Sequence, residues 1–403
     1  MLRLKLHWQI LIALVLAVIY GALFPQYIVY VSWMGDLFLR ALKMIIVPLI
    51  LSSIISGVTN IGNAENLGKL GIKTLTYYLL TSLFAIIVGL LLVNLFQPGV
   101  GADLGLSKNL EELSAAKESF GTTLLNIIPT NIVQSLLDGD MLSIIFFAIL
   151  VGFFITQIKE SYRVNLTNFF DAFFEVMMKI TMFIIKFAPF GIFGIVAVTI
   201  SQQTDLLQLL QSMGMYVLTV MLGLMIHGMV TLPLILKFVA KADPWLHFKA
   251  MTTPILTAFS TSSSNATLPL TIDAVENNSG VSNKITSFTL PLGATVNMDG
   301  TALYECVAAM FIAQAYGIEL TFVQQLIVVI TALLASIGAA GIPMAGLVTI
   351  TIILSAVGLP LEGVGLILSV DRILDMCRTV VNVWSDSCAA VTIAKTEGEE
   401  LKV

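Results

Sequence analysis

The chain has 403 residues, of which 57% are apolar and only 11% are charged. That charged share is less than half of the roughly 25% found in soluble globular proteins, and the mean hydropathy of +0.96 points the same way. A formal net charge of -5, with no basic patch and no interleaved aromatic residues, gives no case for nucleic-acid binding, and no nucleic-acid partner is expected. We therefore expect an all-α polytopic membrane protein that works inside the bilayer, because no polar segment is long enough for a separate catalytic domain.

The N-terminus carries Arg3 and Lys5 ahead of an apolar run, and no small-residue cleavage site follows that run. This pattern predicts a retained first span with a cytoplasmic N-terminus. Cys306, Cys377 and Cys388 lie in apolar surroundings without C-x-x-C spacing. Neither a disulfide framework nor a zinc site is therefore expected.

Apolar segments of spanning length occupy the first 240 residues. They cover residues 8–24, 30–59, 68–96, 122–158, 164–199 and 206–239. A polar loop at residues 99–120 should be exposed to solvent. Asp36, Arg40 and Lys43 recur at helical spacing in the second segment and predict one polar edge near a membrane interface.

From Pro244 onward the apolar segments are short and interrupted. Residues 251–259 and 266–272 flank a Ser-rich tip, and residues 326–335 and 347–357 flank a Gly-rich tip at 336–346. Arms of about ten residues cannot cross a hydrocarbon core about 30 Å thick, but two arms around a polar tip can enter and return. Two such re-entrant hairpins in corresponding positions indicate a transporter built from repeats, with its site at mid-depth.

The segment at residues 285–316 carries polar groups in its middle. Asn297, Asp299 and two glycines, Gly293 and Gly300, interrupt an otherwise apolar run. They predict a locally unwound helix whose free carbonyls, together with one carboxylate, suit a hard monovalent cation. An ordinary polar kink is the alternative.

The last segment carries a stripe of charged and amide side chains. Its members are Asp371, Asp375, Arg378, Asn382 and Asp386. Their spacings of 4, 3, 4 and 4 residues keep them on one face of a helix. The stripe suits a zwitterion with an extra carboxylate, with Asp375 for an ammonium and Arg378 for the side-chain carboxylate. A closed ion-pair network that only holds helices together is the alternative.

No enzyme is expected. His7, His227 and His247 lack metal-ligand spacing and an obvious nucleophile partner, and the Ser-rich tip has no base beside it. No phosphate-binding G-x-x-x-x-G-K-[ST] motif occurs. An intramembrane enzyme is therefore the weakest functional class for this sequence.

Four motifs, in order along nearly the whole chain, carry a family resemblance. They are the Ser-rich tip at 260–265, Asn297-Met298-Asp299-Gly300-Thr301, Ala335-Ser336-Ile337-Gly338-Ala339-Ala340-Gly341-Ile342-Pro343 and Asp375-Met376-Cys377-Arg378-Thr379. Together they resemble the glutamate transporter family of sodium:dicarboxylate symporters, which includes excitatory amino acid transporters and archaeal aspartate transporters. The resemblance implies eight transmembrane helices plus two re-entrant hairpins, inverted repeats, and an elevator-type homotrimer in the plasma or inner membrane.

The resemblance also implies a division of the chain into two parts. A scaffold would comprise residues 1–65 (spans 1 and 2) and 99–200 (the loop and spans 4 and 5). A transport domain would comprise residues 66–98 (span 3) and 201–403 (span 6, hairpin 1, span 7, hairpin 2 and span 8). The second hairpin would act as the gate.

Site residues carry over by similarity. Substrate contacts fall on Ser262, Ser264, Thr301, Gly341, Ile342, Asp375, Arg378, Thr379 and Asn382. Up to three sodium positions are implied: one at Gly293, Asn297, Asn382 and Asp386; one at Thr295, Met298, Ser336, Ile337 and Ala339; one at Tyr78, Thr81, Ser82, Asn297 and Asp299. Glu305 follows Tyr304, as in the mammalian proton-coupled members, whereas archaeal members carry glutamine, so Glu305 is the candidate proton carrier.

The implied function is a secondary-active symporter that takes up L-aspartate or L-glutamate with sodium. Proton co-transport and potassium counter-transport are further options. An anion channel and a neutral amino acid exchanger of the same family are the alternatives, and Arg378 speaks against the exchanger. Two departures from the family stand out: Ser262 and Met376 occupy the positions where a second arginine is usual, and Asn265 replaces the third serine of the tip. Arg372 lies one helical turn before Asp375 and could take over the missing pairing.

Overall fold

The structure is a computed structural model that describes residues 6–63, 69–102, 128–138, 140–202, 206–338 and 345–403. Within these ranges every regular element is a helix and no strand occurs. The predicted all-α class is therefore confirmed for the part of the chain that the structure describes. Most of the polar loop predicted at 99–120 lies outside the described residues.

The helices of the first half are α1 (Leu6–Leu23), η1 (Pro25–Tyr27), α2 (Val29–Asn63), α3 (Lys69–Phe96), α5 (Ile132–Asp138), α6 (Met141–Gln157), α7 (Glu160–Ile185) and α8 (Ala188–Gln202). Those of the second half are α9 (Leu206–Ile226), η3 (His227–Thr231), α10 (Leu232–Ile235), η4 (Leu236–Ala240), α11 (Pro244–Ala250), α12 (Thr252–Thr261), α13 (Ser264–Asp273), η5 (Ala274–Asn278), α14 (Asn283–Val296), α15 (Asp299–Ala315), α16 (Phe322–Gly338), α17 (Ala345–Ala356), η6 (Leu361–Gly363) and α18 (Val364–Thr396).

Fewer helices are long and apolar enough to span a membrane than the sequence predicted. Three stretches of the described chain are long and apolar enough to cross a membrane: Val29–Thr59, Leu70–Phe96 and Leu210–Ala240. A fourth is added if α7 and α8, which meet at 55°, count as one span. The three helices confirm the segments predicted at 30–59, 68–96 and 206–239.

Two predicted continuous segments are broken. The described part of residues 122–158 forms α5 and α6, with Asp140 at the N-cap of α6, where its carboxylate accepts a hydrogen bond from Ser143. Residues 164–199 are divided between α7 and α8. Pro189 is the second residue of α8, where its missing N–H has no helical partner to lose. A proline also disfavours a helical conformation in the residue before it, which explains why the bend lies here.

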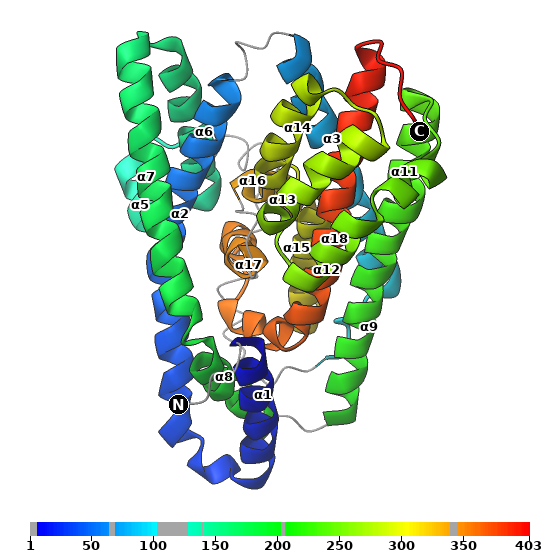
Figure 1. The fold of residues 1–403 in the computed structure, drawn as a ribbon. Helices are drawn as coiled ribbons and strands as arrows, with labels where there is room; N and C mark the ends of the chain where they lie inside the picture. Colours follow the sequence, from blue (N-terminus) through cyan, green and yellow to red (C-terminus); the bar gives the residue numbers. More distant parts are fainter. Residues whose placement is uncertain (1–5, 64–68, 103–127, 139, 203–205, 339–344) are drawn as a thin grey trace.

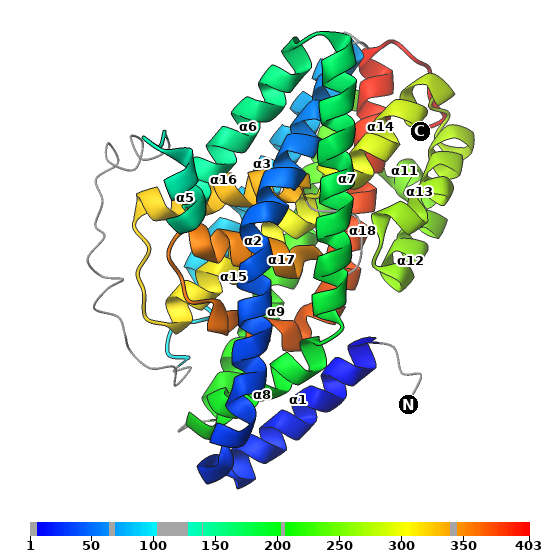
Figure 2. The same ribbon diagram turned by 90° about the vertical axis from the view of Figure 1, so that its left-hand side faces the viewer.

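The helices form two groups (Figure 1). The helices α1, α2, α6, α7 and α8 pack on one another, and α3, α9, α12, α14, α15 and α18 form the second group. The helices α16 and α17 lie between the groups and contact α2 as well as α15. In the turned view, α1 and α8 lie together at one end of the molecule (Figure 2).

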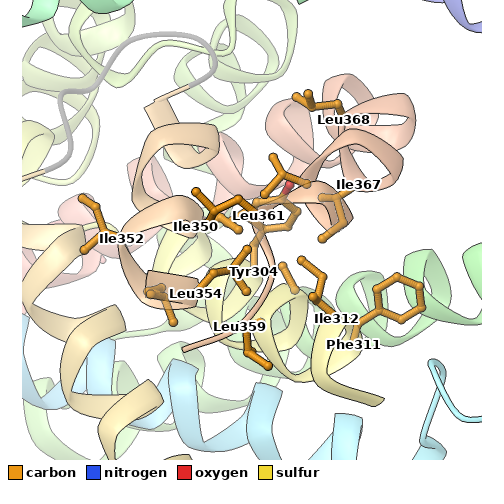
Figure 3. Close-up of a cluster of buried hydrophobic side chains, with 14 of the residues drawn as sticks. Tyr304, Phe311, Ile312, Ile350, Ile352, Leu354, Leu359, Leu361, Ile367 and Leu368 are labelled. Carbon is orange, nitrogen blue, oxygen red and sulfur yellow. The ribbon is translucent and has the colours of Figure 1, made fainter. Parts of the chain in front are cut away.

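Apolar side chains fix the helices that carry the polar stripe. Tyr304 and Phe311 of α15 lie in a buried cluster with Ile350 of α17, Leu361 of η6 and Ile367 of α18 (Figure 3). All five side chains are at most 5% exposed. Close packing of this kind resists small displacements, so α15, α17 and α18 hold their polar groups in fixed relative positions.

The interruptions predicted in the second half are present as helix breaks. The pair α12 and α13 is joined by Ser262 and Ser263, with Ser262 left-handed at φ 51° and ψ 39°, and the two helices pack on each other. This tip is shorter than the 260–265 predicted. The pair α16 and α17 also packs together, and the segment 339–344 between them lies outside the described residues. Helices α14 and α15 are separated by Asn297 and Met298, which confirms the predicted unwinding.

Candidate functional site

A buried arginine lies at the centre of the stripe on α18. Arg378 is 1% exposed. Its Nε and Nη2 donate to Asp375 Oδ1 at 3.0 and 2.8 Å, and its Nη1 donates to Asp371 Oδ1 at 3.1 Å. Tyr304 of α15 donates its hydroxyl to the same Asp371 oxygen at 2.7 Å, and its ring lies 4.3 Å from the guanidinium carbon. Two carboxylates and an aromatic face therefore hold the guanidinium in one orientation.

This arrangement is the ion-pair network that the sequence left open as an alternative. Asp375 and Arg378 were predicted to face opposite ends of a ligand, and here they face each other. Asp371 Oδ2 in this network nevertheless has no hydrogen-bond partner among the described residues, and neither do two other buried atoms of predicted site residues, Ser262 Oγ and Glu305 Oε2. Burial of such an atom without a partner costs about 1–3 kcal/mol. The region therefore keeps hydrogen-bonding capacity for a polar solute.

Two further helices, α12 and α13, pack against α18, the helix that carries the stripe (Figure 1). Ser264 is the first residue of α13, and Ser263 caps that helix by accepting from Ala266 N at 3.2 Å. The free amides and positive dipole of a helix N-terminus favour a carboxylate.

Of the other predicted substrate residues, Thr379 donates its hydroxyl to the Asp375 carbonyl at 2.7 Å. Asn382 joins α18 to the start of α15, since it accepts from Gly300 N at 2.8 Å and donates to Thr301 Oγ1 at 3.0 Å. Gly341 and Ile342 lie outside the described residues, so their predicted gate contacts stay a prediction.

Gly346 of α17 lies directly against the arginine. A Cβ at this position would be 2.7 Å from Arg378 Nη1 and 2.9 Å from its Cζ. We expect Gly346→Ala to displace the guanidinium and to lower substrate affinity by roughly one to two orders of magnitude, on an overpacking cost of about 1–3 kcal/mol. Equilibrium substrate binding to the purified protein measures the effect. Gly214→Ala is the matched control because a Cβ there meets nothing within 4 Å; an equal change in both variants would contradict the close approach.

A second polar cluster lies where α3 meets the break between α14 and α15. Asp299 Oδ1 accepts from Ser82 Oγ at 2.6 Å and from Thr81 Oγ1 at 3.3 Å, and Thr81 also lies 3.4 Å from Asn297 Oδ1. These four side chains are at most 2% exposed. Four of the five members of one predicted sodium position are thus together. Tyr78, the fifth, donates its hydroxyl to the Thr289 carbonyl at 2.7 Å.

The other two predicted sodium positions are assembled to different extents. In the first, Asn297 Nδ2 donates to Asp386 Oδ1 at 2.9 Å, and a Cβ on Gly293 would lie 2.5 Å from that same oxygen. Asn382, the fourth member of this position, is instead hydrogen-bonded to Gly300 and Thr301.

In the remaining position, Thr295 and Ser336 each bond to a carbonyl of their own helix, at Leu292 and Leu333. Met298 is one of the two residues in the break between α14 and α15. Ala339 and the side chain of Ile337 lie outside the described residues. This sodium position stays a prediction.

Sequence reasoning missed two residues that contact Asp299. His227 Nε2 lies 2.9 Å from Asp299 Oδ2, and Ser385 Oγ donates to that oxygen at 2.6 Å. His227 begins η3, a π-helical turn, and the carbonyl of its neighbour Gly228 accepts from Trp384 Nε1 at 2.9 Å. An ionisable side chain inside an apolar span was the available signal, since such groups are functional by default. Asp299 therefore accepts hydrogen bonds from three helical segments besides its own.

Broken helices that gather buried charges and amides define a class of protein: membrane transporters that bind polar solutes at mid-depth. The chain belongs to the sodium:dicarboxylate symporter family, whose profile matches residues 6–396. It is 38% identical to a proton/sodium-glutamate symport protein of Geobacillus stearothermophilus, over 99% of this chain and 96% of that protein. It is 35% identical to a proton/glutamate-aspartate symporter of Escherichia coli strain K12, over 98% and 94% of the two chains. An excitatory amino acid transporter of Caenorhabditis elegans is 38% identical over 91% of this chain and 81% of the relative.

Proposed function

We propose that this protein is a secondary-active symporter that takes up L-aspartate or L-glutamate and is driven by sodium. The fully buried pair of Arg378 and Asp375 carries the proposal. An acidic amino acid has an ammonium to replace Arg378 at Asp375 and a side-chain carboxylate to replace Asp375 at the guanidinium. Its second, α-carboxylate is then available for the free amides at the start of α13. A neutral amino acid has only one carboxylate, so it leaves either the guanidinium or the helix N-terminus without an anion. The names of the relatives, which are glutamate and aspartate symporters, support the same substrates.

Sodium coupling is proposed through the cluster around Asp299 and the neighbouring Asp386. Carboxylate, amide and hydroxyl oxygens are the ligands that a hard cation prefers. Three sodium positions are proposed, with the residues implied by the family resemblance. Asn382 bonds the start of α15, which Asp299 begins, and lies one turn from Arg378 on α18. Cation and substrate would therefore order the same two helices, and each would raise the affinity for the other.

The assembly and movement are also proposals. The two groups of helices correspond to a scaffold (residues 1–65 and 99–200) and a transport domain (66–98 and 201–403) that slides in an elevator motion within a homotrimer. The packing of α1, α2, α6, α7 and α8 on one another supports this division. The plasma or inner membrane is the proposed location, with the α16–α17 hairpin as the gate.

Uptake into sealed proteoliposomes tests the function. Labelled aspartate and glutamate are supplied while sodium, proton and potassium gradients are imposed one at a time. Accumulation above the external concentration under an inward sodium gradient supports a symporter. Equilibration without accumulation would instead indicate a passive pathway such as the anion channel, and uptake of serine in preference to aspartate would indicate a neutral exchanger.

Glu305 is the proposed proton carrier, and its side chain is fully buried, with 0% of its surface exposed. Its Oε1 accepts from Thr349, and among the described residues it has no ion-pair partner. An unpaired charge is expensive to bury, so a carboxyl group here can be carried neutral and give up its proton when its surroundings change.

We expect Glu305→Gln to abolish substrate-driven proton flux while substrate binding is retained, because the amide mimics the neutral acid. A pH-sensitive dye inside the proteoliposomes measures proton entry during aspartate uptake. Glu276→Gln is the control, since Glu276 lies on η5 and bonds Asn283 and Thr286. Unchanged proton flux in Glu305→Gln would assign Glu305 to a structural role.

A further inference from the structure

A second cavity lies on the face of α18 away from the charged stripe. Its volume is about 490 Å³, within the range of about 300–1,000 Å³ that small-molecule sites occupy. Its walls come from α9, η3, α10, α11, α12 and α18, of which α9, α11, α12 and α18 are labelled in Figure 1. The lining consists of methionine, leucine, isoleucine, valine, proline and aromatic side chains, together with Gly228 and the Cys377 thiol. No charged side chain lines the cavity, so it is not part of the substrate or cation clusters.

The cavity lies on a surface that would face hydrocarbon in a membrane. One wall belongs to the candidate span Leu210–Ala240. Three apolar side chains of the lining are exposed: Met229 at 69%, Met225 at 50% and Phe259 at 42%. Surface of this kind inside a span faces lipid, and an apolar cavity offers no polar partners to hold water. The carbonyl of Gly228, a lining residue, already accepts a hydrogen bond from Trp384.

One end of the cavity carries positive charge. Pro244, Trp245 and Phe248 of α11 close this end, and Lys249 Nζ lies 5.4 Å from the centre of the Trp245 ring. Lys249 is exposed, as are Lys237 and Lys241, which precede α11 in the sequence. None of these three lysines forms an ion pair within the described structure.

The nearby carboxylates have other partners. Asp243 caps α11 by accepting from Trp245 N and Leu246 N at 2.8 and 3.1 Å. Glu276 of the adjacent η5 bonds Asn283 and Thr286. Tryptophan and lysine together are typical of a helix end at the membrane interface. A lysine near the membrane surface attracts anionic lipid headgroups.

We propose that this cavity binds an acyl chain of an anionic phospholipid, with the headgroup against Lys241 and Lys249. The chain would contact Cys377 and Val381 of α18, while Asp375 and Arg378 occupy the other side of that helix. The occupant is a membrane component, so this site is independent of which solute the protein transports.

Contact quenching of Trp384 tests the proposal. The chain has four tryptophans, and the variant Trp8→Phe, Trp33→Phe, Trp245→Phe keeps only Trp384, which lines the cavity and is 4% exposed. The full chain is placed in phosphatidylcholine nanodiscs that contain lipids with brominated chains. We expect brominated phosphatidylglycerol to give half-maximal quenching at a mole fraction at least tenfold lower than brominated phosphatidylcholine, because two lysines attract its anionic headgroup.

Two further variants separate the chain from the headgroup. Lys241→Gln with Lys249→Gln should remove the preference for phosphatidylglycerol and leave quenching by both lipids. Gly228→Leu should reduce quenching by both, since a Cβ there meets only Val381 Cγ2 at 3.6 Å and a larger side chain fills the cavity. Absence of quenching by either lipid would overturn the site, and equal quenching by both in the parent variant would overturn the anionic selection.

Discussion

Replacing Arg378 with threonine should abolish uptake of aspartate and glutamate and open the site to serine or alanine. The guanidinium cannot shed its charge, so it requires an anion wherever it is buried. Deleting one partner of a buried pair costs about 3–5 kcal/mol, which is about two to four orders of magnitude in affinity. A neutral amino acid brings no second carboxylate and still offers its ammonium to Asp375. Competition of aspartate and serine for binding to the purified variant measures the change.

Arg372→Thr is the matched control for this substitution. Arg372 lies one turn before Asp375 and 3.7 Å from its Oδ2, but its side chain is 33% exposed. The pair is long and its arginine is partly exposed to solvent, so we expect it to contribute about 0–1 kcal/mol and aspartate affinity to fall by less than tenfold. Near-normal aspartate affinity in Arg378→Thr would show that Arg378 only joins Asp371 and Asp375. A large loss in Arg372→Thr would assign it the role of the second arginine that is absent at Ser262 and Met376.

Helical periodicity and composition predicted which segments form helices better than they predicted where those helices begin and end. The stripe from Asp371 to Asp386 lies on one helix, α18, because five polar groups at helical spacing in an apolar chain are tolerated only on a buried face. The bend at Pro189 was missed because apolar residues continue through it, so hydropathy gives no sign of a break. The Ser-rich tip was predicted too long because serine also occurs inside helices, where it bonds to a carbonyl one turn earlier, as Ser260 does to Leu256.

The candidate site was predictable only where polar groups share one segment. The spacing on α18 gave Asp375 and Arg378 as neighbours, but their direct bond depends on side-chain torsions that no spacing determines. Thr81 and Ser82 are unremarkable hydroxyls in an apolar helix, and only the family resemblance assigned them. Neither the spacing of polar residues nor the family resemblance pointed to His227. Its partner, Asp299, lies 72 residues later in the sequence, and the contact is made from a π-helical turn. Contacts between distant segments are a property of packing, which local patterns do not encode.

Asp299→Asn should raise the sodium concentration needed for half-maximal substrate binding by at least one order of magnitude. The substitution keeps the shape but removes the charge, and it puts an N–H₂ group where one carboxylate oxygen accepted two hydrogen bonds. Those bonds come from Ser82 and Thr81 on one oxygen and from His227 and Ser385 on the other. At an effective dielectric constant of about 20, a carboxylate about 4 Å from a cation contributes about 4 kcal/mol, so removing its charge is sufficient for the tenfold shift.

Because linkage is reciprocal, the same variant should bind aspartate more weakly at a fixed, low sodium concentration and recover at high sodium. Titration of sodium against choline, with bound aspartate as the readout, gives both quantities in one experiment. Asp273→Asn is the control: Asp273 is exposed on α13, where it accepts from Asn277 at 2.8 Å. A parallel loss of affinity at every sodium concentration would point to a damaged fold rather than a damaged cation site. An unchanged sodium dependence would remove Asp299 from the cation site, and the hydroxyls of Thr81 and Ser82 would then serve only to satisfy a buried carboxylate.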